Sequence, residues 1–313
     1  MGAGFSRFLT LFDQNYPPKS KFATSHIHDL SGRVVIVTEP EGGNSGVGKE
    51  TIKVLLLHNA KVYMASRSKS RAAEAIQELK TATGKQAHFL ELDLSSLESI
   101  RKAAQEFMRG LMWPPKEQIT SDGYDLQFGT NVIGHFYFTE LLMPALLAGK
   151  ETSLDGHARV VTTSSSGAYF HTLKWDTFVD GPARLQMSTQ DLYYQSKFAN
   201  VVVARQVAKR YGDQGILSVS VNPGVLRTDL QRYIPNWQRP FMYVLLHPAW
   251  KGALTQLYAG TMPEALNHNG EFFIPWARVG RCRDEAYDDG IGERLWDWLQ
   301  DQVKSNDQSP IPQ

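Results

Sequence analysis

Cysteine is nearly absent from this chain of 313 residues. The single residue, Cys282, cannot form an intramolecular disulfide and cannot build a multi-cysteine metal site. Small secreted domains depend on disulfides, whereas cytosolic proteins keep their thiols reduced. We therefore expect a protein of a reducing compartment in which Cys282 is an ordinary thiol.

Long apolar runs and excess charge are also missing. No stretch of 18 or more consecutive apolar residues exists, so a membrane-spanning helix is not expected. The apolar segment from Phe8 to Phe12 is too short for a signal peptide. The 33 Lys and Arg residues balance 32 Asp and Glu residues, which removes any global attraction to nucleic acid or anionic lipid. These absences favour a cytoplasmic, non-secreted protein with a small uncharged partner and no nucleic acid.

The N-terminus carries the one membrane signal. Gly2 and Ser6 fit the Met-Gly-x-x-x-Ser pattern of N-myristoylation, which is short and weakly specific. We expect residues 1–29 to form a disordered or loosely docked N-terminal extension. Weak association with a membrane surface is the alternative.

Apolar, β-branched runs alternate with helical periods along the rest of the chain. The strand-like runs are RVVIVT from Arg33, KVYMAS from Lys61, AHFLELDL from Ala87, ARVVTTSS from Ala158, ILSVSVNPG from Ile216 and GEFFIP from Gly270. Continuous apolar strands that alternate with helices are typical of a parallel sheet covered on both faces. The sequence predicts one doubly wound (Rossmann) α/β domain over residues 30–303, followed by a C-terminal tail over residues 304–313.

A glycine-rich turn follows the first of these strands. The run GGNSGVG places Gly42, Gly46 and Gly48 where the strand turns into a helix. Glycine lets the backbone approach a pyrophosphate, and a helix N-terminus offers free N–H groups with partial positive charge. Such turns also occur for purely conformational reasons. The turn alone therefore indicates a nucleotide site without establishing one.

A Tyr–Lys pair at helical spacing follows the strand that ends in TTSSSG. Tyr193 and Lys197, in YYQSK, are four residues apart and so share one helix face. A tyrosine with a pKa of about 10 is a poor base at neutral pH, and a neighbouring ammonium lowers that pKa. The pair is therefore suited to proton transfer.

These motifs occur in the order of a known family. The runs GGNSGVG, LDL (Leu92 to Leu94), TNVIGHF, VVTTSSSG, YYQSK and VNPGVLRT resemble those of the short-chain dehydrogenase/reductases. The chain looks most like their retinol-dehydrogenase and WW-domain-oxidoreductase branch. The resemblance covers nearly everything after Lys19 and implies hydride transfer between a nicotinamide cofactor and an alcohol or carbonyl compound.

The resemblance implies four catalytic residues. Tyr193 would be the proton donor or acceptor at the substrate oxygen, and Ser165 would hold that oxygen by a hydrogen bond. Lys197 would bind the nicotinamide ribose and lower the pKa of Tyr193, while Asn131 would hold a water in the proton relay.

Alternatives remain for two of these roles. Ser164 and Ser166 compete with Ser165, which we favour from its register against the preceding strand, and an ordinary strand-end hydroxyl is a further interpretation. Asn131 would otherwise be a core amide that bends its helix.

The resemblance also implies which residues bind the cofactor. They are Gly42, Ser45, Gly46, Val47, Gly48, Arg67, Asp93, Asn131, Tyr193, Lys197, Val225 and Thr228. Asp93 would contact the adenine, and Val225 and Thr228 the nicotinamide carboxamide. Arg67 stands where a carboxylate would bind the ribose hydroxyls of NAD, and a guanidinium there favours the 2′-phosphate of NADP. We therefore expect NADP (NADPH) rather than NAD, with a surface arginine as the alternative.

The segment after the cofactor loop predicts the substrate class. Residues 226–250 are rich in aromatic and aliphatic side chains, and we expect them to form a lid over a small lipophilic alcohol or carbonyl substrate. Retinoids, steroids, fatty aldehydes and terpenoid intermediates of secondary metabolism fit equally. The aromatic stripe is equally typical of a core or of a homodimer contact.

The chain departs from the family in two places. Glu39, Pro40 and Glu41 separate Thr38 from the first glycine of the turn, which brings carboxylates toward the phosphate site. Before Gly110 the family has a hydrophobic strand ending in Asn-Asn-Ala-Gly that this chain lacks. We therefore expect one central strand to be missing and the middle of the sheet to be open.

Such an insertion and deletion at sharp points are typical of errors at exon boundaries. We interpret the chain as a misassembled reading of an active enzyme, with a natural variant as the alternative. The rival function is a non-catalytic relative with a disrupted cofactor site.

Overall fold

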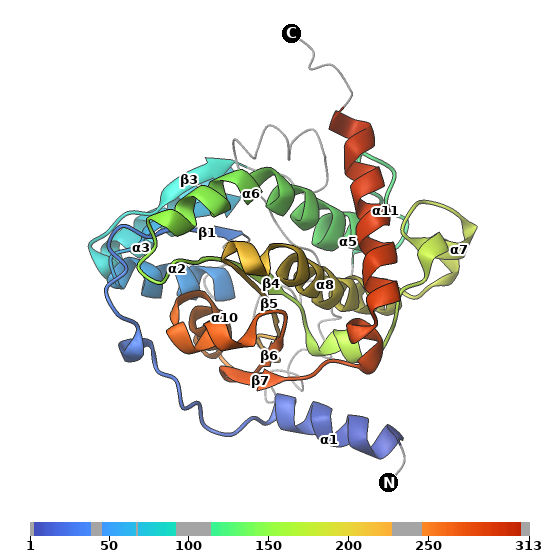
Figure 1. Cartoon of the computed structure of the whole chain (residues 1–313), viewed down its shortest axis with the longest axis horizontal. Helices are drawn as coiled ribbons and strands as arrows, with labels where there is room; N and C mark the ends of the chain where they lie inside the picture. The colour runs from blue at the N-terminus through green and yellow to red at the C-terminus, as the bar shows by residue number, and fades with distance from the viewer. Residues whose placement is uncertain (1–2, 39–45, 67, 92–113, 227–245, 308–313) are drawn as a thin grey trace.

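The strands of the computed structural model form two sheets (Figure 1). The structure describes residues 3–38, 46–66, 68–91, 114–226 and 246–307, with the side chains of 3–8 and 305–307 left aside. The first sheet has the order β1 (Val34–Thr38), β2 (Lys61–Ser66), β3 (His88–Glu91). The second has the order β4 (Ala158–Thr163), β5 (Ile216–Val221), β6 (Phe272–Ile274), β7 (Arg278–Gly280). All neighbours run parallel except β6 and β7.

Helices connect the strands and cover both faces (Figure 1). The α-helices are α1 (Ala3–Asn15), α2 (Val47–Leu57), α3 (Lys69–Thr83), α5 (Leu126–Phe128), α6 (His135–Glu151), α7 (Pro182–Gln186), α8 (Thr189–Tyr211), α10 (Ala249–Thr261) and α11 (Asp289–Asp307). A π-helical turn, η3 (Gly129–Gly134), joins α5 to α6. Short 3-10 turns are η1 (Thr24–His26), η4 (Ser166–Tyr169), η5 (Trp175–Thr177), η6 (Gly212–Gln214), η8 (Pro263–His268) and η9 (Asp284–Tyr287).

Three apolar cores among the described residues hold the helices to the strands, and the smallest of them lies around β5. Helices α2, α3 and α10 pack with β2 around residues such as Ile52, Leu79 and Leu257. Helices α6, α8 and α11 form the second core, which contains Phe136 and Phe198. Continuous apolar strands between two helix layers are what the sequence pattern predicts, and the doubly wound α/β fold is confirmed.

Local signals set the helix ends. Ser68 caps α3 by accepting a hydrogen bond from the backbone N–H of Arg71, and the helix stops at Gly84 in the left-handed region (φ 71°). Ser188 caps α8 in the same way through the N–H of Asp191 at 3.0 Å. Serine at a helix start and glycine just past its end satisfy the unpaired terminal N–H and C=O groups.

β1 and β4 face a common cavity at the centre of the domain. Among the described residues β1 pairs only with β2, and β4 pairs with β5 alone. Every residue of both strands lines one cavity of about 1010 Å³. β5, which has a neighbour on each side, is buried along its whole length, whereas no residue of β1 or β4 is fully buried. This arrangement agrees with the predicted loss of a central strand, although residues 92–113 lie outside the described part of the chain.

A polar bridge joins the two sheets at the start of β1 and β4. The guanidinium of Arg33 lies 3.0 Å from the carboxylate of Asp155, which Arg159 of β4 binds at 2.7 Å. Burial by itself raises the pKa of Asp155, but hydrogen bonds from Ser153, Arg159 and Arg33 hold that pKa well below its usual value. The carboxylate is therefore charged at neutral pH and links one sheet to the other.

The N-terminal segment is a docked helix, which corrects the expectation of a disordered or loosely docked tail. α1 lies beside the β6–β7 hairpin (Figure 1). Gln14 is 1% exposed; its side chain accepts a hydrogen bond from Asn222 and donates one to the hydroxyl of Tyr169, both at 2.8 Å. Asp13 pairs with Arg278 at 2.9 Å. A buried amide with two partners fixes the helix, because its release would leave polar groups unsatisfied.

One helical stretch in the described residues, Leu126–Glu151, is long and apolar enough to cross a membrane by length and composition. It runs from α5 to α6 and contributes Phe136 and Tyr137 to the core. Core helices pass the same test, so the stretch is weak evidence for a membrane span.

Candidate active site

Tyr193 and Lys197 lie on one face of α8 and line the central cavity. The Nζ atom of Lys197 is 5.7 Å from the centre of the Tyr193 ring. It also donates a hydrogen bond to the carbonyl of Thr163, the last residue of β4, at 3.2 Å. The four-residue spacing therefore brings phenol and ammonium to the same space, beside the carboxyl end of a parallel strand, where α/β folds bind their ligands.

The structure separates the three candidate serines after β4. Ser164 is buried, and its hydroxyl donates to the backbone carbonyl of Lys197 at 2.7 Å, which ties the strand end to α8. All three serines line the cavity. The Oγ atom of Ser165 accepts a hydrogen bond from the N–H of Gly167 at 3.1 Å. The hydroxyl of Ser164 is thus engaged with α8, and the choice of Ser165 as the catalytic serine stays a prediction.

Gly167 brings the serine turn against the tyrosines of α8. A Cβ atom at this position would lie 2.8 Å from the ring of Tyr194 and 3.3 Å from the ring of Tyr193. The turn that carries Ser165 can approach the phenol this closely because residue 167 has no side chain.

Asn131 lies in the π-helical turn η3 and is fully buried. Its side-chain amide donates to the hydroxyl of Ser196 at 3.0 Å, and that hydroxyl donates to the backbone carbonyl of Tyr193 at 2.7 Å. π-Helical turns often occur at functional sites. Asn131 is therefore linked to α8, the helix of Tyr193, while its expected water-holding role stays a prediction.

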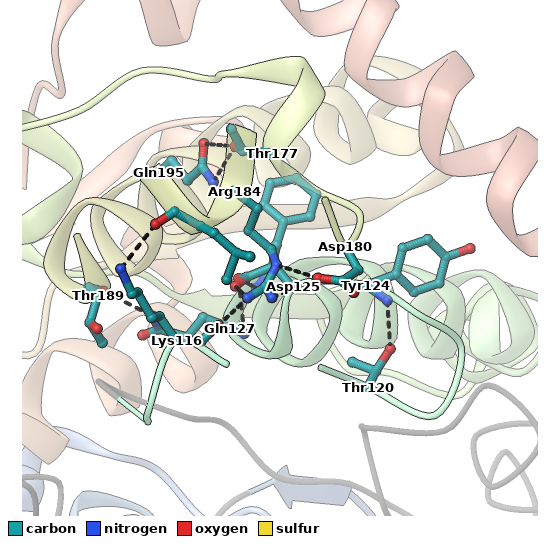
Figure 2. A network of polar contacts seen from close by, with 12 residues as sticks. Lys116, Thr120, Tyr124, Asp125, Gln127, Thr177, Asp180, Arg184, Thr189 and Gln195 are labelled. Atoms are coloured by element: carbon teal, nitrogen blue, oxygen red, sulfur yellow. Dashed lines mark hydrogen bonds and ion pairs between the residues drawn. The ribbon is translucent and has the colours of Figure 1, made fainter. Parts of the chain in front are cut away.

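A buried ion pair fixes the start of the helix that bears Asn131 (Figure 2). Asp125 caps α5 by accepting hydrogen bonds from the N–H groups of Gln127 and Phe128 at 3.1 and 2.8 Å. Arg184 of α7 lies 3.7 Å from Asp125 and 2.7 Å from Asp180. Burial raises the pKa of Asp125 to about 6, an effect that the hydrogen bonds and the charge of Arg184 only partly offset. Our sequence reasoning missed this pair, although an Asp before an apolar helical run is an N-cap signal.

The N-terminus of α2 lies at the same cavity. Gly46 is its N-cap residue and supplies no side-chain cap. Gly46, Val47 and Gly48 line the cavity, as does Val225 after β5. Unpaired N–H groups at a helix start attract anions, so the described part of this cradle fits a dinucleotide phosphate. Five predicted cofactor residues lie outside the described residues: Gly42, Ser45, Arg67, Asp93 and Thr228.

Comparisons with known sequences agree with this geometry. A family model described as short chain dehydrogenase matches residues 33–177. A short-chain dehydrogenase/reductase of Armillaria gallica is 52% identical over 307 residues, covering 94% of this chain and 98% of that protein. Mouse retinol dehydrogenase 11 is 32% identical over 302 residues, covering 89% of this chain and 88% of the mouse protein.

Solved structures share the fold. An uncharacterized protein from Mycobacterium paratuberculosis has a TM-score of 0.69 at 26% identity, covering 91% of this chain and 98% of that one. The active-site complex of Pseudomonas aeruginosa RhlG with NADP has a TM-score of 0.60 at 21% identity. This likeness covers 79% of this chain and 95% of the RhlG chain. The chain belongs to the short-chain dehydrogenase/reductase family, in a retinol-dehydrogenase-like branch of NAD(P)-dependent oxidoreductases.

Proposed function

We propose that this protein interconverts an alcohol and a ketone or aldehyde on a small lipophilic substrate, with NADP as its cofactor. The observation that carries the proposal is one shared cavity. Ser165, Tyr193 and Lys197 line it together with Gly46 and Val47 at the start of α2. Proton-transfer groups and a phosphate-binding helix end therefore face the same space.

Each residue has a definite task in this proposal. The phenol of Tyr193 gives its proton to the substrate oxygen during reduction and takes it back during oxidation. The ammonium of Lys197 favours the phenolate and orients the cofactor ribose, and the hydroxyl of Ser165 holds the substrate oxygen. NADP, when bound, supplies or accepts the hydride. Asn131 helps to position Tyr193 through the hydroxyl of Ser196, which bonds to the Tyr193 backbone carbonyl.

The cavity wall supports a lipophilic substrate. Phe170 and Tyr194 line the cavity next to Tyr193, with ring centres 5.0 Å apart, and Phe170 is 53% exposed. Exposed aromatic side chains at a cavity mouth favour apolar ligands. Residues 227–245, most of the predicted lid, lie outside the described residues. The preference for NADP rests on Arg67.

Two weaker associations belong to the same proposal. Leu9, Phe12 and Tyr16 project outward from α1 and the residue after it, each about half exposed. Such a ridge suits weak membrane-surface contact or a homodimer interface.

The test is a titration of the purified chain with NADPH, followed by cofactor fluorescence, and then a reduction assay with lipophilic ketones and aldehydes. We expect saturable binding and carbonyl-dependent loss of NADPH absorbance. Binding without turnover on any carbonyl compound would contradict the oxidoreductase proposal.

The second candidate is an inactive relative with a disrupted cofactor site. It is favoured by the open edge between β1 and β4, since β1 leads into the phosphate turn. The comparison with the Armillaria protein extends over 307 residues but covers 94% of this chain, so that relative has residues that this chain lacks. Absence of NADPH binding in the titration would support this candidate.

A further inference from the structure

We propose that the gap between β1 and β4 binds an extended apolar peptide, which adds one strand to both sheets at once. This proposal goes beyond the proposed activity and does not depend on it. The occupant is a peptide from another chain, of five to six residues, the lengths of β1 and β4.

The first argument is backbone pairing. In the described structure each of the two strands has one hydrogen-bonded neighbour, and every residue of both lines the cavity between them. The open edge of a strand presents a row of N–H and C=O groups that need partners. An aliphatic ligand would fill the space but leave both rows unpaired, whereas one strand satisfies both.

The second argument is direction. Arg33, directly before β1, binds both the Asp155 carboxylate at 3.0 Å and the His157 carbonyl at 3.4 Å. His157 directly precedes β4, and Asp155 lies two residues before His157. The starts of β1 and β4 therefore lie together. At the other end, Thr38 and Ser164 line the same cavity. The two strands run in the same direction, so one peptide can pair parallel with each.

The third argument is the chemistry of the cavity walls. Phe138, Leu142 and Leu146 of α6 line the cavity, as do Leu55 of α2 and Leu257 of α10. A strand between two helix layers must be apolar on both faces. β5, with the sequence Ile-Leu-Ser-Val-Ser-Val, shows that a mainly apolar strand carrying two serines on one face is buried along its whole length in this sheet.

The experiment uses the full chain without cofactor and a fluorescein-labelled peptide that carries the β5 sequence between terminal lysines. Binding is followed by fluorescence anisotropy. Hydrogen exchange with mass spectrometry then measures the amides of Val34–Thr38 and Ala158–Thr163. We expect saturable binding and at least tenfold slower exchange in both strands.

Two matched controls distinguish strand pairing from nonspecific hydrophobic binding. A peptide with proline at its second and fourth positions keeps the apolar character but loses ladder donors, so we expect at least tenfold weaker binding. Ala145 and Ala148 are both exposed on α6, but of the two Ala145 alone lines the cavity. Ala145→Arg should weaken binding at least fivefold, and Ala148→Arg should not.

Several outcomes overturn the proposal. They are equal affinity for the proline peptide, slower exchange in neither strand or in one strand alone, and equal effects of the two arginine variants. Because no cofactor is present, none of these outcomes depends on whether the chain binds NADPH.

Discussion

Arg33 and Asp155 connect the two sheets across the open centre of the domain. Their side chains meet at 3.0 Å, 24% and 20% exposed, at the start of β1 and just before β4. In the described structure no strand lies between β1 and β4 to transmit packing from one sheet to the other. The ion pair, with Arg159 as its second cation, therefore adds a polar link between two sheets that α10 also joins by packing against both α2 and β4.

Replacing Arg33 tests this connection. Arg33→Met should lower the free energy of unfolding by about 1 kcal/mol, a value reduced for partial solvent screening. The pKa of the Asp155 carboxyl is lowered in the folded protein. The stability that this carboxylate contributes is therefore fully present above its unfolded pKa of about 4 and is lost as the pH falls below that value. Urea unfolding at several pH values measures both effects. Arg278→Met, which removes the surface pair with Asp13, is the matched control, and an equal loss there would refute a special role for Arg33.

For Asp125 we expect stability to depend on pH in the opposite direction from Asp155. Its pKa is raised to about 6 in the folded protein, above the value of about 4 in an unfolded chain. Between these values the folded protein binds the extra proton, so the contribution of Asp125 to stability falls as pH rises toward 6. We therefore compare the free energies of unfolding of the parent and of Asp125→Asn in urea. Between about pH 4 and pH 7 the value for the parent should fall by about 2 kcal/mol more than the value for the variant.

Asp180 is the control for this prediction. It binds the same arginine but is exposed to solvent, and the hydrogen bond from Arg184 lowers its pKa. The free energy of unfolding of the parent should therefore rise relative to that of Asp180→Asn as the pH rises through the acid range. Parallel pH profiles for the two variants would contradict the assignment of a raised pKa to Asp125.

Tyr193→Phe tests the proposed proton transfer. Phenylalanine keeps the ring against Gly167 but has no proton to give, so we expect reduction to be abolished and NADPH affinity to stay within a few-fold. Steady-state kinetics and fluorescence titration measure the two quantities. Tyr211→Phe makes the same change on the same helix outside the cavity. If Tyr193→Phe turned over at the rate of that control, Tyr193 would have no part in the mechanism.

Arg67 predicts the cofactor preference. A charge-assisted contact with the 2′-phosphate contributes about 1.5 to 3 kcal/mol, enough for at least a tenfold preference for NADPH over NADH. Arg67→Ala should reduce this preference mainly by lowering the affinity for NADPH. Titrations with both cofactors measure this, and equal affinities in the parent chain would count against the prediction.

Repair of the two departures tests their separate effects. Insertion of a hydrophobic strand ending in Asn-Asn-Ala-Gly before Leu111 should fill the gap between β1 and β4 and raise the melting temperature markedly. Deletion of Glu39 to Glu41 should change stability little, because lengthening a surface loop costs little entropy. Calorimetry and NADPH titration of each repair alone and of both together provide the measurement.

We expect tight NADPH binding to need both repairs, since one supplies the sheet and the other the phosphate turn. An unmodified chain that melts cooperatively at ordinary mesophilic temperatures and binds NADPH in the micromolar range would show that the cofactor domain is not impaired.

Local sequence determined the elements and part of the site. Ser68 and Gly84 bound α3 because capping acts between residues close in the chain. The four-residue spacing of Tyr193 and Lys197 placed both on one face of α8 through helix geometry alone. The absence of a central strand stays a prediction, because residues 92–113 lie outside the described part of the chain.

Tertiary structure decided which distant groups meet. The hydroxyl of Ser164 donates a hydrogen bond to the backbone carbonyl of Lys197, 33 residues away. The docking of α1 depends on Gln14 and Asn222, which are 208 residues apart. Periodicity shows which face of a helix or strand is apolar, but it does not identify the partner of a buried polar group, because that partner is chosen by packing in three dimensions.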